Sequence, residues 1–183
     1  MAKLLHRPLQ ATLLATLAMA AMAAIPALAG TAVLCTGTVE VTFSPPLTNT
    51  AQSTLISVTE SHNPCTHVPA GGLPFLMSAH SSAQVSRMSS CSSLLTGGPG
   101  SSLVQWSNGD TSTYNWNASA SFINGNILVL RTGTVTSGRY AGESTSETLI
   151  ESPALAGNPD FLTACSTTGV PKVTGTYLSN VTP

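Results

Sequence analysis

Serines, histidines and carboxylates are the residues of this sequence that could do chemistry. Nucleophilic catalysis needs a serine beside a base, and His62, His67 and His80 could each supply that base. No Gly-x-Ser-x-Gly motif occurs, however, and the spacing selects no serine over the many others. We therefore expect no catalytic residues and no enzymatic activity.

The carboxylates Glu143, Glu147 and Glu151 recur at every fourth residue. Paired carboxylates could do general acid–base chemistry. In a segment that otherwise has the pattern of a strand, this spacing favours a polar face in contact with water. We expect these three side chains to be solvated.

A metal site is the competing interpretation of the segment Ser-His-Asn-Pro-Cys-Thr-His, in which His62 and His67 flank Cys65. Pro64 disfavours a helix there, and the chain has no second ligand pair such as Cys-x-x-Cys. We expect neither a metal nor a cofactor.

The four cysteines Cys35, Cys65, Cys91 and Cys165 are an even number, which in a secreted chain predicts two disulfides with three possible connectivities. We favour Cys65–Cys91, which would close the Gly-, Pro- and His-containing segment between them. Its companion, Cys35–Cys165, would tie the first strand to the segment before the last. The bridge that closes this longer loop should stabilise the fold more than the other, and its own contribution should be about 4 kcal/mol on a chain-entropy account.

Residues 1–29 have the pattern of a secretory signal peptide. A basic start precedes a short uncharged apolar segment at 9–24, and Ala27-Leu28-Ala29 fits the small-x-small cleavage pattern. The apolar segment is short for a membrane span. We expect a secreted, extracellular protein in which residues 30–183 form a single domain, with no membrane partner after cleavage.

Charge narrows the range of partners. Residues 30–183 hold four Lys and Arg against seven Asp and Glu, a net charge of about −3 with no basic patch. Nucleic acids and anionic membranes are bound mainly through clustered Lys and Arg, so neither is expected as a partner.

Two hairpins in series are expected between Val104 and Val129. Apolar residues from Tyr114 to Phe122 alternate with polar ones, which is typical of a strand with one dry face. A three-residue loop, Ser107-Asn108-Gly109, would place Trp106 on the dry face. A two-residue Asn124-Gly125 turn would pair Phe122 with Ile127.

Turn signals divide the rest of the chain into short segments. Strands are expected at 33–43, 54–60, 75–77, 84–88, 127–135, 144–150 and 172–178, with loops at 62–74 and 96–102 and a short helix at 159–164 that Asn158 caps. Eight or nine short strands indicate an all-β fold, an antiparallel immunoglobulin-like β-sandwich. A small closed β-barrel is the alternative.

Four segments carry a resemblance to a protein family: Cys35-Thr-Gly-Thr, Thr42-Phe-Ser-Pro-Pro-Leu-Thr, Trp106-Ser-Asn-Gly-Asp-Thr-Ser-Thr and Gly133-Thr-Val-Thr-Ser-Gly-Arg-Tyr-Ala-Gly. They resemble small secreted proteins of actinobacteria, of uncharacterised function. The resemblance implies export and an immunoglobulin-like sandwich, and it supplies no catalytic residues.

Trp106, Tyr114 and Trp116 are the candidate ligand-binding residues, because rings on one sheet face could stack on a carbohydrate or cell-wall polymer. Burial in the core is the favoured alternative. A protease inhibitor that uses the Cys65–Cys91 loop, with Leu73-Pro74-Phe75, is a further hypothesis.

The function expected overall is a secreted, non-catalytic binding or structural module whose partner is a polysaccharide or another secreted protein. Two Asn-x-Ser/Thr sequons, at Asn117 and Asn180, would carry glycans only in a eukaryotic secretory pathway.

Overall fold

The computed structural model describes residues 32–153 and 160–183. The expected signal peptide at 1–29 and the expected helix cap at Asn158 lie outside these ranges. No helix within them has the length and apolar character needed to cross a membrane.

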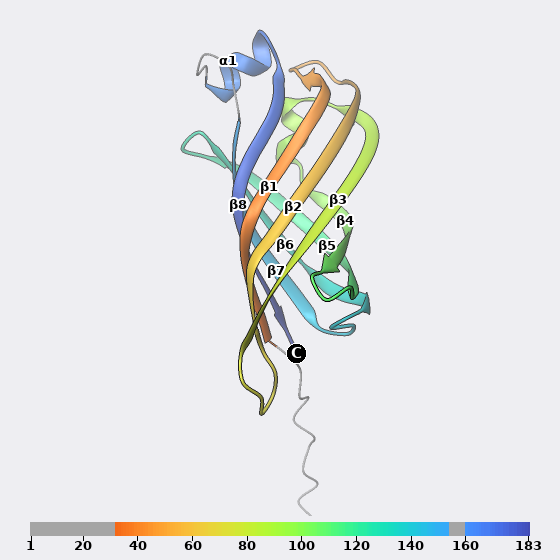
Figure 1. Cartoon of the computed structure of the whole chain (residues 1–183). Helices are drawn as coiled ribbons and strands as arrows, with labels where there is room; N and C mark the ends of the chain where they lie inside the picture. Colours follow the sequence, from red (N-terminus) through yellow and green to blue (C-terminus); the bar gives the residue numbers. More distant parts are fainter. Residues whose placement is uncertain (1–31, 154–159) are drawn as a thin grey trace, which may run out of the picture.

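Eight antiparallel strands form a closed barrel in which each strand pairs with the next and the last pairs with the first (Figure 1). The strands are β1 (Ala32–Leu47), β2 (Gln52–Val68), β3 (Phe75–Ser89), β4 (Gly98–Trp106), β5 (Thr111–Ile123), β6 (Asn126–Gly138), β7 (Ser144–Pro153) and β8 (Val170–Thr182). A 3-10 helix, η1 (Cys91–Leu95), connects β3 to β4, and α1 (Phe161–Ser166) precedes β8. The all-β antiparallel prediction is confirmed.

The predicted sandwich is wrong, and the alternative of a closed barrel is right. β1 pairs with β8 from Val33 opposite Val181 to Thr42 opposite Lys172, while its other edge pairs with β2. One sheet therefore closes on itself, whereas a sandwich needs two sheets. Closure leaves the dry face of every strand inside the barrel.

Both predicted hairpin turns are confirmed. Trp106 and Asp110 flank the three-residue loop, and Gly109 has a φ of 92°. In the second turn Phe122 pairs with Ile127, and Asn124 and Gly125 both have positive φ, as a two-residue hairpin requires.

The strand boundaries differ more from the prediction than the hairpin turns do. β2 continues through the expected loop at 62–74 as far as Val68, and β3 runs unbroken through the polar segment at 79–82. Strand β4 begins at Gly98, inside the expected loop at 96–102. The helix begins after Asp160, whose carboxylate accepts a hydrogen bond from the Thr163 backbone N–H at 2.9 Å.

The disulfides are Cys35–Cys65 and Cys91–Cys165, so the predicted pairing was wrong. Cys35 lies directly opposite Cys65 in the β1–β2 register, with 4.0 Å between the Cα atoms. Cys91, at the start of η1, bonds to Cys165 on α1. The pairing follows strand register and helix position, which the spacing of cysteines in the sequence does not reveal.

The interior of the barrel has two apolar clusters. One contains Val39, Val41, Phe43, Leu47, Ile56, Ile127, Leu149, Val173 and Tyr177 from the strands, and Phe161, Ala164 and Cys165 from α1. The other contains Val33, Cys35, Cys65, Ala79, Val104, Trp106, Tyr114, Val135 and Val181. Buried polar side chains in the middle of the strands, described below, lie between the two clusters.

Candidate functional site

The barrel is open along the seam between β3 and β4. These strands pair at three positions only, where Ala79, His80 and Ser81 lie opposite Trp106, Gln105 and Val104. Beyond Ser81 the strands separate, while the other edge of β3 stays paired with β2 as far as Ser89. The wall therefore has a lateral gap in the half of the barrel nearer α1.

Residues that face inward beside this gap are exposed. By the alternation of β3, Ala83, Val85 and Arg87 follow Ala79 and Ser81 on the inner face. Ala79 and Ser81 are buried, whereas Val85 is 49% exposed. The gap therefore leads from solvent to the interior.

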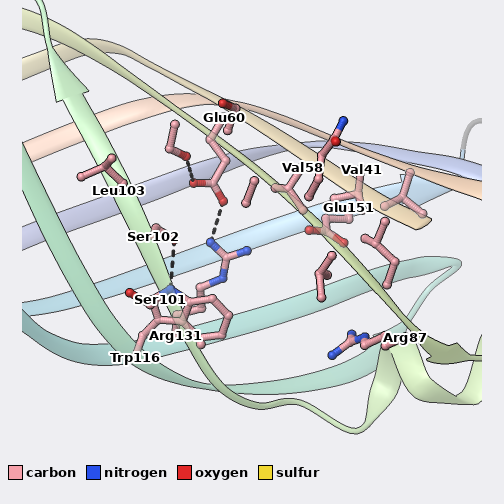
Figure 2. Close-up of a pocket in the computed structure, with 18 of the residues that line it drawn as sticks. Val41, Val58, Glu60, Arg87, Ser101, Ser102, Leu103, Trp116, Arg131 and Glu151 are labelled. Carbon is pink, nitrogen blue, oxygen red and sulfur yellow. Dashed lines mark hydrogen bonds and ion pairs between the residues drawn. The ribbon is translucent and has the colours of Figure 1, made fainter. Parts of the chain in front are cut away.

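A cavity of about 490 Å³ lies behind the gap (Figure 2). Its apolar wall is formed by Val41, Phe43, Ile56, Val58, Leu94 and Val173. Its polar wall contains Glu60, Ser81, Arg131 and Glu151, with Trp116 beside them and Arg87 near the opening. The volume lies within the range of small-molecule sites, roughly 300–1,000 Å³.

Trp116 takes its position because Gly100 lies opposite it in the β4–β5 register. A Cβ at Gly100 would collide with the indole ring, so only glycine leaves room for the ring at this place. The indole N–H donates to Ser102 Oγ at 3.1 Å. The ring is thereby fixed at the cavity wall.

A buried ion-pair network forms the polar wall. Arg131 Nη1 donates to Glu60 Oε1 at 2.6 Å and to Glu147 Oε2 at 3.2 Å. Ser81 Oγ donates to Glu60 Oε2 at 2.6 Å. The Arg131 guanidinium also lies 4.7 Å from the centre of the Trp116 ring, in cation–π geometry.

The network sets the charge states of its members. Burial opposes ionisation of Glu60, but Arg131 and the Ser81 hydroxyl outweigh it and lower the carboxyl pKa. For Glu147 burial outweighs the attraction of Arg131, so its pKa is raised. Burial lowers the pKa of His62, whose Nε2 lies 4.0 Å from Glu60, to about 4. His62 is therefore neutral at neutral pH.

The expectation that Glu143, Glu147 and Glu151 share a solvated face was wrong. Glu147 and Glu151 are 8% and 6% exposed and alternate with outward-facing residues of β7, so they point into the barrel. Glu143 precedes β7 and is half-buried. Every second strand residue faces inward, and Glu147 at such a position pairs with Arg131 of the neighbouring strand.

The end of the barrel away from α1 is closed by aromatic side chains. His67 is fully buried, stacks on Phe75 with 4.9 Å between ring centres, and bonds through Nδ1 to the Tyr140 hydroxyl. Trp106 packs edge-on against His67 and Tyr140. These contacts fill that end of the barrel with side chains, while the lateral gap between β3 and β4 lies beside the cavity.

The candidate aromatic residues share the inner face, as predicted. Trp106 and Tyr114 are buried in the second apolar cluster, outside the cavity lining. The Trp106 indole N–H donates to Ser112 Oγ at 2.8 Å. Trp116 alone of the three lines the cavity. The three rings do not form a flat binding surface on the outside of the sheet. Their role in binding a ligand stays a prediction.

The other sequence-derived candidates lie apart from the cavity. Cys65 bonds to Cys35 and Cys91 to Cys165, so no disulfide braces the loop expected to inhibit proteases; that segment is the end of the β2–β3 hairpin. Across residues 32–153 and 160–183 no group of three His, Cys, Asp or Glu side chains is placed to hold a metal ion.

Sequence reasoning missed Glu60 and Arg131. The signal was present, because Arg131 continues the inward series of Ile127 and Val129 on β6, and Glu60 continues that of Ile56 and Val58 on β2. A charged residue at the inward-facing position of a strand is costly to bury alone and so indicates a partner inside the barrel.

Comparisons with protein-family models, curated proteins and solved structures found no match to the chain.

Proposed function

We propose that this protein is a secreted, non-catalytic binding protein that holds one small, largely apolar molecule inside its barrel. The lateral gap admits the molecule, and the apolar wall around Val41, Phe43 and Val58 binds its tail. The observation that carries the proposal is an interior cavity of about 490 Å³ that reaches solvent through the β3–β4 seam. Eight-stranded barrels have an interior of the size that either fills with side chains or holds one small ligand.

Features of the chain support the other parts of the proposal. Two disulfides are compatible with an oxidising compartment such as the extracellular medium. Glu60 and Arg131 of the cavity wall are engaged in an ion-pair network, and no serine with a neighbouring histidine base lies among the lining residues. Apolar burial therefore supplies the binding energy, and the polar wall selects the ligand.

Fluorescence of the uncharged probe N-phenylnaphthylamine tests the proposal with the delipidated secreted protein. We expect a blue-shifted increase in probe emission, excited by energy transfer from Trp116. A Trp106→Phe variant should keep this transfer, because Trp116 is the tryptophan that lines the cavity.

A matched pair of variants identifies the site. Val58→Phe places a ring in the cavity and should weaken probe binding at least tenfold. Thr59→Phe adds the same ring at the next, outward-facing residue of β2 and should leave binding unchanged. Absence of probe binding, or equal binding by the two variants, would contradict the proposal.

A further inference from the structure

Glu151 is the one acidic side chain of the cavity wall that has no polar partner in the described residues. Its carboxylate makes no hydrogen bond or ion pair with another described residue, although Glu60 has both Ser81 and Arg131. Glu151 is 6% exposed and lies opposite Ile127 on one side and Gly175 on the other. Figure 2 shows it beside Val41 and Val58, in the apolar part of the cavity.

An unpartnered buried carboxyl is costly to the fold. Transfer of a carboxylate from water to an apolar site without a compensating partner opposes folding, so such groups are rare unless they have a function. Burial raises the pKa of Glu151; Arg131 lowers it in part, and Glu60 raises it further. A cation placed beside Glu151 would reverse this effect and restore the carboxylate.

The charges around the cavity favour a cationic ligand over an anionic one. Arg131 is the buried cation of the wall, and Glu60 and Glu147 already neutralise it. Its Nε has no hydrogen-bond partner but is shielded from the cavity. An anionic ligand would therefore meet the carboxyl groups of Glu60 and Glu151 beside a guanidinium that is already paired. Arg87 is exposed at the opening, where water screens its charge.

We propose that the ligand of this cavity carries a protonated amine, which pairs with the carboxylate of Glu151 while the ligand's apolar tail lies against Val41, Phe43 and Val58. The inference rests on the proposed function, because it names the chemical class that the cavity holds. Aliphatic amines keep their proton at neutral pH, as the lysine side chain does. The ion pair would form in a largely apolar site, where the attraction is stronger than in water.

Three compounds with the same ten-carbon tail test the inference: decylamine, decanol and decanoate. Each is titrated calorimetrically into the intact secreted protein at pH 7. We expect decylamine to bind at least tenfold more tightly than decanol, and decanoate to bind most weakly. Glu151→Gln should lower the affinity for decylamine to that for decanol and leave decanol binding unchanged.

Glu40→Gln is the matched control, because it removes a carboxylate from the outer surface, where Glu40 pairs with Lys172. It should preserve the preference for the amine. If decanol binds as tightly as decylamine, the inference is overturned and the cavity proposal stands. If none of the three compounds binds, both are overturned. The order of the three affinities in the unaltered protein tests the preference for an amine even if Glu151→Gln fails to fold.

Discussion

Arg131 Nη1 lies 2.6 Å from Glu60 Oε1 and thereby joins β6 to β2 through the interior of the barrel. In a ring of strands ordered β1 to β8, these two strands are on opposite sides. The pair is therefore a cross-link between facing walls, and backbone hydrogen bonds of the sheet cannot replace it. It also gives the cavity its polar wall.

Loss of Arg131 should destabilise the barrel strongly. Arg131→Met leaves Glu60 and Glu147 buried without their cation, and breaking a buried ion pair on one side costs about 3–5 kcal/mol. Urea denaturation measures the free energy of unfolding. Lys172→Met removes the cation of an exposed pair and should cost about 1 kcal/mol or less. Equal losses in the two variants would refute an interior role for Arg131.

The two disulfides should differ in their contribution. Cys91–Cys165 closes a separation of 74 residues and Cys35–Cys65 one of 30, so chain entropy favours the first by about 0.8 kcal/mol. We expect the Cys91→Ser/Cys165→Ser variant to unfold at a lower urea concentration than Cys35→Ser/Cys65→Ser. The opposite order would show that the link between β1 and β2 matters more than loop length.

Acid should destabilise the protein through His67. Burial, and then the charge of Arg139, lower the pKa of His67 from 6.5 to about 4. Between pH 6.5 and 4 the imidazole is protonated in the unfolded chain but neutral in the folded one. The free energy of unfolding therefore falls as the pH drops through this range. A shift of this size corresponds to roughly 3 kcal/mol.

The free energy of unfolding at pH 7 and at pH 4.5 checks this effect in the parent protein and in His67→Gln. The variant should lose less stability on acidification. Comparison with the parent cancels the contribution of Glu147 and Glu151, whose raised pKa values act in the opposite direction. Identical pH dependence in both proteins would show that His67 is not held neutral by its surroundings.

Gly100→Ala should displace the Trp116 ring at the cavity wall. The added methyl group would occupy space that the Trp116 ring now fills, so the ring must leave its present position. We expect weaker binding of N-phenylnaphthylamine and a shift in tryptophan emission. Gln105→Ala, at an exposed position of the same strand outside the cavity lining, is the control. Unchanged affinity in Gly100→Ala would mean that the ring does not border the bound probe.

The parts of the fold that depend on local rules were predictable. The inward series of Val33, Cys35, Val39, Val41 and Phe43 on β1 and the two Asn-Gly turns follow from alternation and from the need for positive φ. Closure of the sheet into a barrel was not predictable from such local rules. Whether β8 returns to pair with β1 depends on the tilt and stagger of the whole sheet, to which every strand contributes a little.

The candidate site was hidden by the assumption that polar residues face solvent. Glu60, His62 and Ser81 interrupt the apolar alternation of β2 and β3. Glu60 was placed at the end of an expected strand, His62 in an expected loop, and Ser81 between two expected strands. In the barrel these side chains point inward: Ser81 and Arg131 donate to Glu60, and His62 Nε2 lies 4.0 Å from the same carboxylate. Their partners are distant in sequence, so only the closed sheet reveals them.

The connection between β3 and β4 is held by a bond that lies outside the sheet. η1 occupies this connection, its Cys91 is covalently joined to α1, and the Cys91 backbone N–H donates to the Thr48 carbonyl at 2.8 Å. The segment that links the two strand edges is thus anchored by a sulfur–sulfur bond, which does not open with heat as hydrogen bonds do. Access of the proposed ligand to the barrel is therefore expected to depend on redox state, and reduction, more than warming, should loosen the opening.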